Sequence, residues 1–327
     1  MQICGICGKI HNMDNVFYSN FMVSVNAVLP MALLMLLGML IRRQDWLNGQ
    51  ELKRVNGVIF KVFFFFMLFN STYHATINDY RPRLLIYGLA AVLILWVLSW
   101  LFSCAVTKDG ATRGAMIQNL YRSNFVILGY PLVVNMFGYE NSGVTAMMVA
   151  VIVPFYNVLA VITLEYFRGG NVNVKKMIKG VLLNPMILGF LSAGALRLVG
   201  VVLPTFMDKL VTQLGLMTSP LAIIVLGASF SGMGKPRWLH VFISVFGRLF
   251  VVPAVGLPLS YWMGFRGIEF ATLLVMFGAP TAVISYAMAQ QMDSDEVLAG
   301  NSVVYSTALS CFTLFCWIFI WKTIGAF

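Results

Sequence analysis

The sequence predicts an all-α membrane protein that crosses the bilayer many times, and three observations carry this prediction. Of the 327 residues, 60% are hydrophobic and only 10% are charged, and long apolar runs recur along the whole chain. A soluble domain has roughly 45–50% apolar and about 25% charged residues, because its surface must face water. A bilayer removes that requirement, and each crossing takes about 20 apolar residues. The length therefore allows about ten helices joined by short loops.

Ten apolar runs can be delimited, because polar or Gly/Pro-rich segments separate them. The weakest separation is marked only by Gly200 and Pro204. The expected transmembrane helices are residues 17–41, 54–76, 83–106, 113–137, 142–167, 179–200, 205–230, 237–262, 268–291 and 296–324.

The Lys and Arg residues predict the orientation. Loops that follow odd-numbered helices hold twelve of them: Arg42, Arg43, Lys53, Arg54, Lys108, Arg113, Arg168, Lys175, Lys176, Lys179, Lys235 and Arg237. The other side holds six: Lys9, Arg81, Arg83, Lys209, Arg266 and Lys322. The positive-inside rule then places the first set in the cytoplasm and both termini outside a cell membrane. The net charge of +10 is thereby a topological signal, and no basic patch favours nucleic-acid binding.

An internal repeat is visible in the spacing of helix-breaking and polar residues. Pro30 in the first helix is followed 155 residues later by Pro185 in the sixth, and Asn124 is followed 157 residues later by Thr281. Five helices per copy is an odd number, so the two copies must be inverted in the membrane, as in many alternating-access transporters. The predicted organisation is a tail (1–16), a first repeat (17–167), a cytoplasmic loop (168–178) and a second, inverted repeat (179–327).

The fourth and ninth predicted helices carry the residues that could bind a substrate. Arg122, Ser123 and Asn124 lie within an apolar run, and Pro280 interrupts another. A charge at the bilayer centre costs about 2.5–3.5 kcal/mol, so Arg122 needs water, a partner or a ligand. Paired breaks at membrane depth indicate a transport site. Since half-helix N-termini expose N–H groups that suit anions, these breaks and Arg122 together predict a carboxylate substrate.

Four segments carry a resemblance to a known family: YRSNFVILGYPLVVNMFG, LLNPMILGFL, GAPTAVISYAMAQQMDSDEVLAGNSVVYSTALS and VLPMALLMLLGMLIRR. In this order they resemble the fourth, the sixth, the ninth and tenth, and the first helix of the auxin efflux carrier family. The resemblance begins near Val16 and implies ten helices in a sodium/proton antiporter-like fold, with a scaffold, a transport domain and crossed, broken helices 4 and 9. It also implies carriage of organic anions, such as indole-3-acetate in plants or dicarboxylates in bacteria, and favours a homodimer.

The resemblance carries over to particular residues. It puts the helix crossing at Ser123 and Asn124 and at Pro280 and Thr281, and a family Tyr-Asn pair corresponds to the fifth helix, where helix–helix hydrogen bonding is the alternative role. Plant members have Pro where this chain has Ser123, which weakens the forced break. The predicted substrate-binding residues are Arg122, Ser123, Asn124, Tyr156, Asn157, Pro280 and Thr281.

Other chemistry is not expected. Cys4 and Cys7 with nearby His11 form an incomplete metal-ligand set, and no His lies near a Ser/Asp pair, so the sequence predicts no metal, cofactor or enzymatic activity. Arg248, deep in the eighth helix, is expected to pair with a substrate or an acid. The predicted function is secondary transport of small organic anions by alternating access, and the alternatives are a membrane channel or a substrate sensor.

Overall fold

The computed structural model describes residues 29–30, 32–74, 81–138, 142–168, 179, 182–230 and 234–327. The predicted tail with Cys4 and Cys7, the start of the first helix and nearly all of the loop 168–178 lie outside these residues. Within the described part of the chain the structure is helical, apart from one isolated β-bridge.

Four long helices run without interruption, close to where the hydrophobic runs predict them. They are α4 (Pro82–Val106), α7 (Gly143–Phe167), α10 (Thr205–Phe230) and α15 (Glu296–Thr323). Their ends follow local rules, since Pro82 occupies the first turn of α4 and the Asp295 carboxylate caps α15. The weakly marked separation is also real. Gly200 ends α9 (Pro185–Val199) with φ 74°, a left-handed cap that suits glycine.

The remaining helices are interrupted in two different ways. Two of them continue through a π-helical turn: α2 (Gly49–Val58), η1 (Ile59–Phe63) and α3 (Phe64–Tyr73), and α11 (Trp238–Phe246), η3 (Gly247–Val251) and α12 (Val252–Trp262). Two others leave helical geometry altogether: α5 (Gly110–Tyr121), which resumes as η2 (Phe125–Gly129) and α6 (Tyr130–Phe137), and α13 (Gly267–Gly278), which resumes as α14 (Ile284–Gln291).

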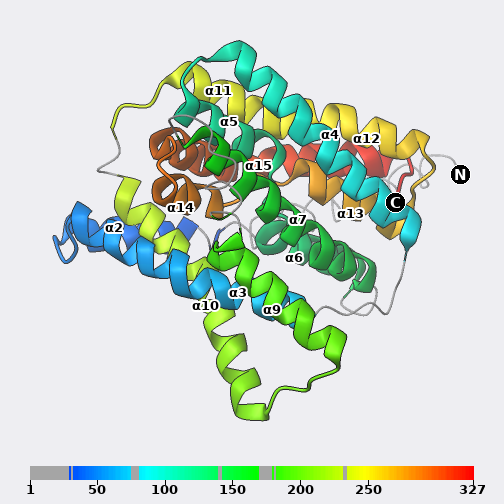
Figure 1. The fold of residues 1–327 in the computed structure, drawn as a ribbon. Helices are drawn as coiled ribbons and strands as arrows, with labels where there is room; N and C mark the ends of the chain where they lie inside the picture. Colours follow the sequence, from blue (N-terminus) through cyan, green and yellow to red (C-terminus); the bar gives the residue numbers. More distant parts are fainter. Residues whose placement is uncertain are drawn as a thin grey trace, which may run out of the picture.

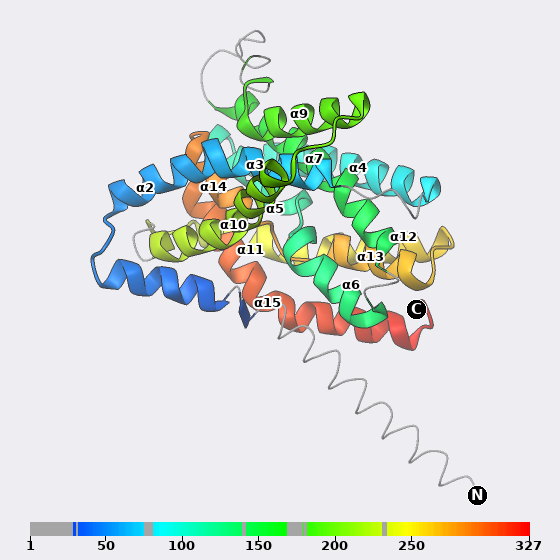
Figure 2. The same ribbon diagram turned by 90° about the horizontal axis from the view of Figure 1, so that it is seen from below.

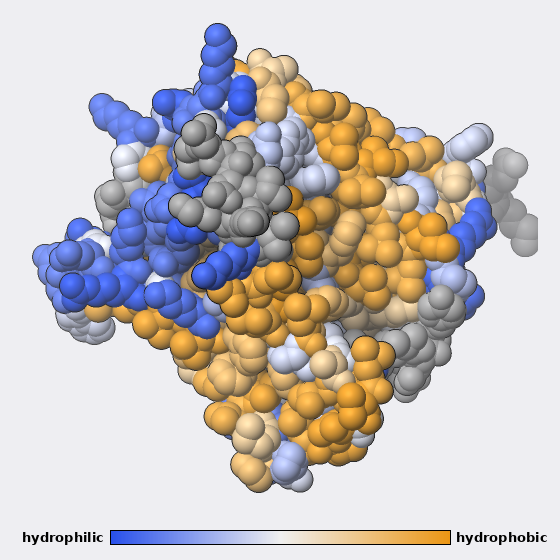
Figure 3. All heavy atoms as spheres, in the orientation of Figure 1, coloured by the Kyte–Doolittle hydropathy of each residue, from blue (hydrophilic) through white to orange (hydrophobic). Residues whose placement is uncertain are grey.

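Five described helices are long and apolar enough to cross a membrane by length and composition alone: Pro82–Val106, Gly143–Phe167, Thr205–Ser229, Trp238–Trp262 and Glu296–Thr323. The breaks explain part of the difference from the ten expected spans, because α5, α6, α13 and α14 are each too short to cross. Apolar residues face outward over the middle of the molecule, whereas hydrophilic residues gather over α2 (Figure 3). The chain is therefore an all-helical membrane protein, and the ten-span repeat remains a prediction.

The helices pack as two groups. The first contains residues 32–43, α2, α3, α9 and α10, with α3 lying beside both α9 and α10 (Figures 1 and 2). Glycines let these helices approach closely: a Cβ on Gly38 would lie 2.1 Å from the Ile224 carbonyl oxygen, and one on Gly227 would lie 2.1 Å from that of Met35. The second group contains α4–α7 and α11–α15.

Contacts between the described loops fall into two sets, one at each end of the helices. At one end the Asp295 N–H donates to the Ala111 carbonyl at 3.2 Å, and Arg168 donates to Asp293 at 3.1 Å. At the other end the Gly267 N–H donates to the Ala326 carbonyl at 2.8 Å. The end that holds α2 and the first turn of α5 is thus the predicted cytoplasmic end.

Candidate functional site

Two extended segments cross at the centre of the second group. Ser123 and Thr281 form an antiparallel bridge, and the Asn124 N–H donates to the Pro280 carbonyl at 2.7 Å. The Ala282 N–H donates to the Arg122 carbonyl at 3.3 Å. Backbone groups released by each broken helix are therefore satisfied by the other, which is the condition for non-helical backbone at this depth.

The two helices end for different reasons. Pro280 disfavours helical geometry at the preceding residue, and Ala279 accordingly has ψ 149°. No proline lies directly after the end of α5. Arg122 nevertheless turns to ψ 113°, and the helix resumes after Asn124. Pairing with the opposite segment holds this second break. The helix is therefore interrupted here although Ser123 stands where plant members of the family have Pro.

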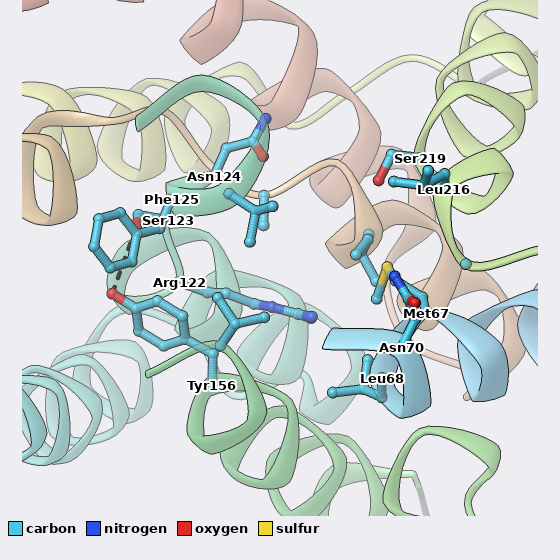
Figure 4. A pocket seen from close by; sticks show the side chains of 15 residues that line it. Met67, Leu68, Asn70, Arg122, Ser123, Asn124, Phe125, Tyr156, Leu216 and Ser219 are labelled. Carbon is cyan, nitrogen blue, oxygen red and sulfur yellow. Dashed lines mark hydrogen bonds between the residues drawn. The ribbon is translucent and has the colours of Figure 1, made fainter. Parts of the chain in front are cut away.

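A cavity of about 290 Å³ lies beside the crossing, between the two helical groups (Figure 4). One wall comes from the crossing and α7, including Arg122, Ser123, Asn124 and Tyr156. The opposite wall comes from α3 and α10. Its residues are Met67, Leu68, Asn70, Gly215, Leu216 and Ser219. Most of this lining is apolar, and among the residues that the structure describes Arg122 is its one charged member.

Arg122 is 2% exposed and carries its charge among neutral groups. Its guanidinium donates to the Gln118 side-chain oxygen at 3.1 Å, to the Met288 sulfur at 2.9 Å and to the Asn157 side-chain oxygen. No acidic side chain pairs with it among the described residues. Figure 4 shows the side chain extending from the crossing toward Leu68 and Asn70. A buried cation without a counter-charge favours binding of an anion.

Asn124 adds a donor that has no protein acceptor. The residue is 4% exposed, and its side-chain nitrogen is buried without a hydrogen-bond partner in the described part of the chain. The half-helix that begins after it contributes Phe125 and Val126 to the cavity wall, and the start of α14 contributes Ala282 and Ile284. Two helix N-termini and one free amide therefore approach the same space as Arg122.

Of the other predicted residues, some line the cavity and some lie behind its wall. The Tyr156 hydroxyl lies 3.4 Å from the Ser123 hydroxyl, and both residues line the cavity. Asn157 lies behind them, where it holds Arg122. Pro280 and Thr281 do not line the cavity. The Thr281 hydroxyl donates to the Asn119 carbonyl at 3.1 Å, so these two residues fix the crossing.

The α3–α10 wall was not found by sequence reasoning. Asn70 is its main polar group, and its side-chain oxygen accepts from Thr212 at 3.0 Å, which leaves the amide nitrogen to serve a ligand. Ser219 contributes a hydroxyl from α10. The available signal was a single amide or hydroxyl within each apolar run, which is too common in membrane helices to identify a site.

Arg248 has a role that the sequence did not predict. It is 1% exposed and donates to four backbone carbonyls. Two lie at the end of α13, Met276 at 2.8 Å and Ala279 at 2.9 Å, and two at the end of α5, Leu120 and Tyr121, both at 3.3 Å. The expected pairing with an acid is wrong for the described residues. The guanidinium instead joins the C-termini of both half-helices, where unpaired carbonyls carry partial negative charge.

A cavity beside crossed, broken helices is the arrangement of membrane carriers. The sequence model of a family described as membrane transport protein matches residues 171–318 of the chain. An uncharacterized transporter of Methanothermobacter thermautotrophicus is 24% identical over 311 residues, which cover 91% of this chain and 98% of the relative. An uncharacterized transporter of Methanocaldococcus jannaschii is 24% identical over 312 residues, covering 90% and 98%. These matches confirm the resemblance to the auxin efflux carrier family, whose members are membrane transport proteins.

Proposed function

We propose that the protein is a secondary carrier of small organic anions, built from two inverted five-helix repeats, which binds its substrate carboxylate at the crossing of the fourth and ninth predicted helices. In this proposal both termini lie outside a cell membrane, the chain has no enzymatic activity, and it works as a single copy or a homodimer. The function class follows from the transporter matches. The substrate class rests on the site.

One observation carries the substrate assignment, namely the buried charge of Arg122 at the cavity wall among neutral partners. Its three partners are an amide of Gln118, an amide of Asn157 and a thioether, so an entering carboxylate would supply the missing counter-charge. The amide of Asn124, which has no partner among the described residues, would offer the substrate a further donor from the same cavity wall.

The rest of the cavity favours a substrate with one carboxylate and an apolar body. The wall opposite Arg122 offers Asn70 and Ser219, which are neutral, together with Met67 and Leu216. A second carboxylate on that side would be desolvated without a cation to balance it. Dicarboxylates are therefore expected to bind more weakly than monocarboxylates of similar length.

The contacts between the two helical groups support alternating access. Toward the predicted cytoplasmic end, the buried Asn56 side chain on α2 donates to the Gln290 side-chain oxygen on α14 at 2.6 Å. This contact joins the two groups on one side of the cavity. A carrier needs such contacts to be made on one side and released on the other during each cycle.

The test is counterflow of a radiolabelled monocarboxylate into proteoliposomes, with wild type compared to Arg122→Gln. Loss of the charge-assisted contact, worth about 1.5–3 kcal/mol, predicts at least a tenfold loss of affinity for the anion. An uncharged amide analogue should lose little. Lys209→Gln, which removes an exposed cation, is the matched control and should behave as wild type. Equal losses for the anion and its amide would mean that Arg122 is structural and would remove the anion assignment.

The same experiment separates a carrier from a channel or a sensor. A carrier gives saturable uptake that substrate on the opposite side accelerates. A channel gives flux without saturation or acceleration, and a sensor binds the ligand but moves none.

A further inference from the structure

A second concave site lies between α2 and the C-terminal end of α14, and it shares no lining residue with the cavity at the crossing. The residues that line it recur on one helix face: Gln50, Lys53, Arg54, Gly57, Val58 and Lys61, with Gln291 of α14 on the other side. The groove has a volume of about 360 Å³. It lies at the end of the molecule where hydrophilic residues gather in Figure 3.

Three cations surround this groove without acidic partners. Lys53, Arg54 and Lys61 are exposed, and no ion pair or side-chain hydrogen bond engages their charged groups among the residues that the structure describes. The acid on the same helix, Glu51, is turned to the helix start, where its carboxylate accepts from the Asn48 N–H at 2.7 Å. The groove therefore has a positive electrostatic potential and enough room for a compact anion.

The groove also crosses from polar to apolar surface. Gln50, Lys53 and Arg54 come first along the helix, and the exposed valines that follow, Val58 and Val62, are 53% and 42% exposed. Lys61 lies among these valines. A charged headgroup with attached acyl chains matches this order of cations followed by apolar side chains, whereas a soluble anion would leave the valines without a partner.

From this arrangement we infer that the groove binds the phosphate headgroup of an anionic phospholipid from the predicted cytoplasmic leaflet. The phosphate lies between Lys53, Arg54 and Lys61, and the acyl chains follow Val58 and Val62. Gly57 leaves the space open, because a Cβ there would lie 3.4 Å from the Gln291 side-chain oxygen and anything larger would fill the groove. Because Gln291 belongs to α14, the lipid contacts both helical groups.

The test measures retention of phosphatidylglycerol by the full chain in detergent, using native mass spectrometry and thermal protection, with phosphatidylcholine as the zwitterionic reference. The variant Lys53→Gln/Arg54→Gln/Lys61→Gln is expected to bind phosphatidylglycerol on the order of 100-fold more weakly, since each cation near a membrane surface contributes severalfold. The control Arg43→Gln/Lys108→Gln/Lys235→Gln removes the same charge from exposed positions at the same end and should retain the lipid.

A second variant tests the shape of the groove with its charge unchanged. Gly57→Leu fills the space and improves helix propensity, so it should fold and lose phosphatidylglycerol, whereas Gly49→Leu on the same helix meets nothing within 4 Å and should keep it. Equal loss in the control triple variant, or full retention by Gly57→Leu, would reduce the site to diffuse surface charge and overturn the proposal. Equal protection by glycerol phosphate alone would replace the lipid by a soluble anion and overturn it as well.

Discussion

Replacing Arg248 by Met should destabilise the helix crossing more than replacing Arg122, the other buried cation among the described residues. Met is unbranched and long enough to fill much of the same space as Arg. It has no donors, however, for the four carbonyls at the ends of α5 and α13 that Arg248 contacts. Since those carbonyls are buried between helices, water cannot replace the lost donors without opening the packing.

The magnitude follows from the two short contacts. Hydrogen bonds from a charged donor contribute about 1.5–3 kcal/mol each, so the bonds of 2.8 Å to Met276 and 2.9 Å to Ala279 together contribute about 3–6 kcal/mol. The two bonds of 3.3 Å to α5 add less. Burying the guanidinium costs several kcal/mol, which offsets part of the gain. A net loss of about 2–4 kcal/mol is expected for Arg248→Met.

Arg248→Lys separates charge from geometry. Lys keeps the positive charge beside both helix C-termini, but a single ammonium cannot span carbonyls on two helices as a guanidinium does. It should therefore recover about half of the lost stability. Lys209→Met, at an exposed position, is the control for loss of a cation.

The assay is heating of the purified protein followed by size-exclusion chromatography, together with substrate counterflow. The expected order of stability is wild type, then Lys, then Met, with counterflow falling in the same order because the crossing shapes the cavity. Unchanged stability in Arg248→Met would refute the reasoning. So would a Lys variant as unstable as Met, since the charge would then contribute nothing.

Three further predictions concern the substrate site, a helix cap and the contact between groups. Asn124→Ala should leave expression unchanged and weaken anion binding about 10–100-fold, and normal binding by the folded variant would remove the amide from the site. Hydrogen bonding from Thr112 lowers the pKa of Asp109 below its usual 3.8, so the carboxylate stabilises the fold above about pH 4 and this contribution is lost as pH falls through the lowered pKa. Asp109→Asn should therefore melt earlier at pH 7, with the difference vanishing in acid, and a constant difference would contradict the linkage. Asn56→Leu removes the contact to Gln290, about 0.5–1.5 kcal/mol, and should change the counterflow rate about 2–10-fold, whereas an unchanged rate would mean that this contact does not form part of the cycle.

The helix boundaries were predictable because short-range signals set them. The fifth run, predicted at 142–167, is α7 at Gly143–Phe167, and the seventh, predicted at 205–230, is α10 at Thr205–Phe230. Polar residues mark the ends of α7, because polar loops cannot enter hydrocarbon. The start of α10 is marked instead by Gly200, which caps α9, and by Pro204.

The two helix breaks were predictable to different degrees. Pro280 ends α13 through its own ring, and one sequence is enough to see that. The break after Tyr121 depends on the antiparallel pairing of Ser123 with Thr281, 158 positions away. No local residue forces this break, so it was inferred from the polar residues in an apolar run, from the spacing of the repeat and from the family resemblance at Ser123 and Asn124. The wall formed by Asn70 and Ser219 depends on how α3 and α10 pack, which spacing along the chain does not reveal.

The two buried arginines show most clearly what the sequence could not distinguish. Each is a single cation in an apolar run, so hydropathy assigns both the same cost and the same need for a partner. The partners decide their roles. Arg248 donates to backbone carbonyls of two helix ends, which cannot move without unfolding those ends. Arg122 donates to side chains of Gln118, Asn157 and Met288, which can rotate away at the cost of a rotamer change. In the proposed carrier, Arg122 is the one of these two arginines that can exchange its partners for a carboxylate and take them back on release in every cycle.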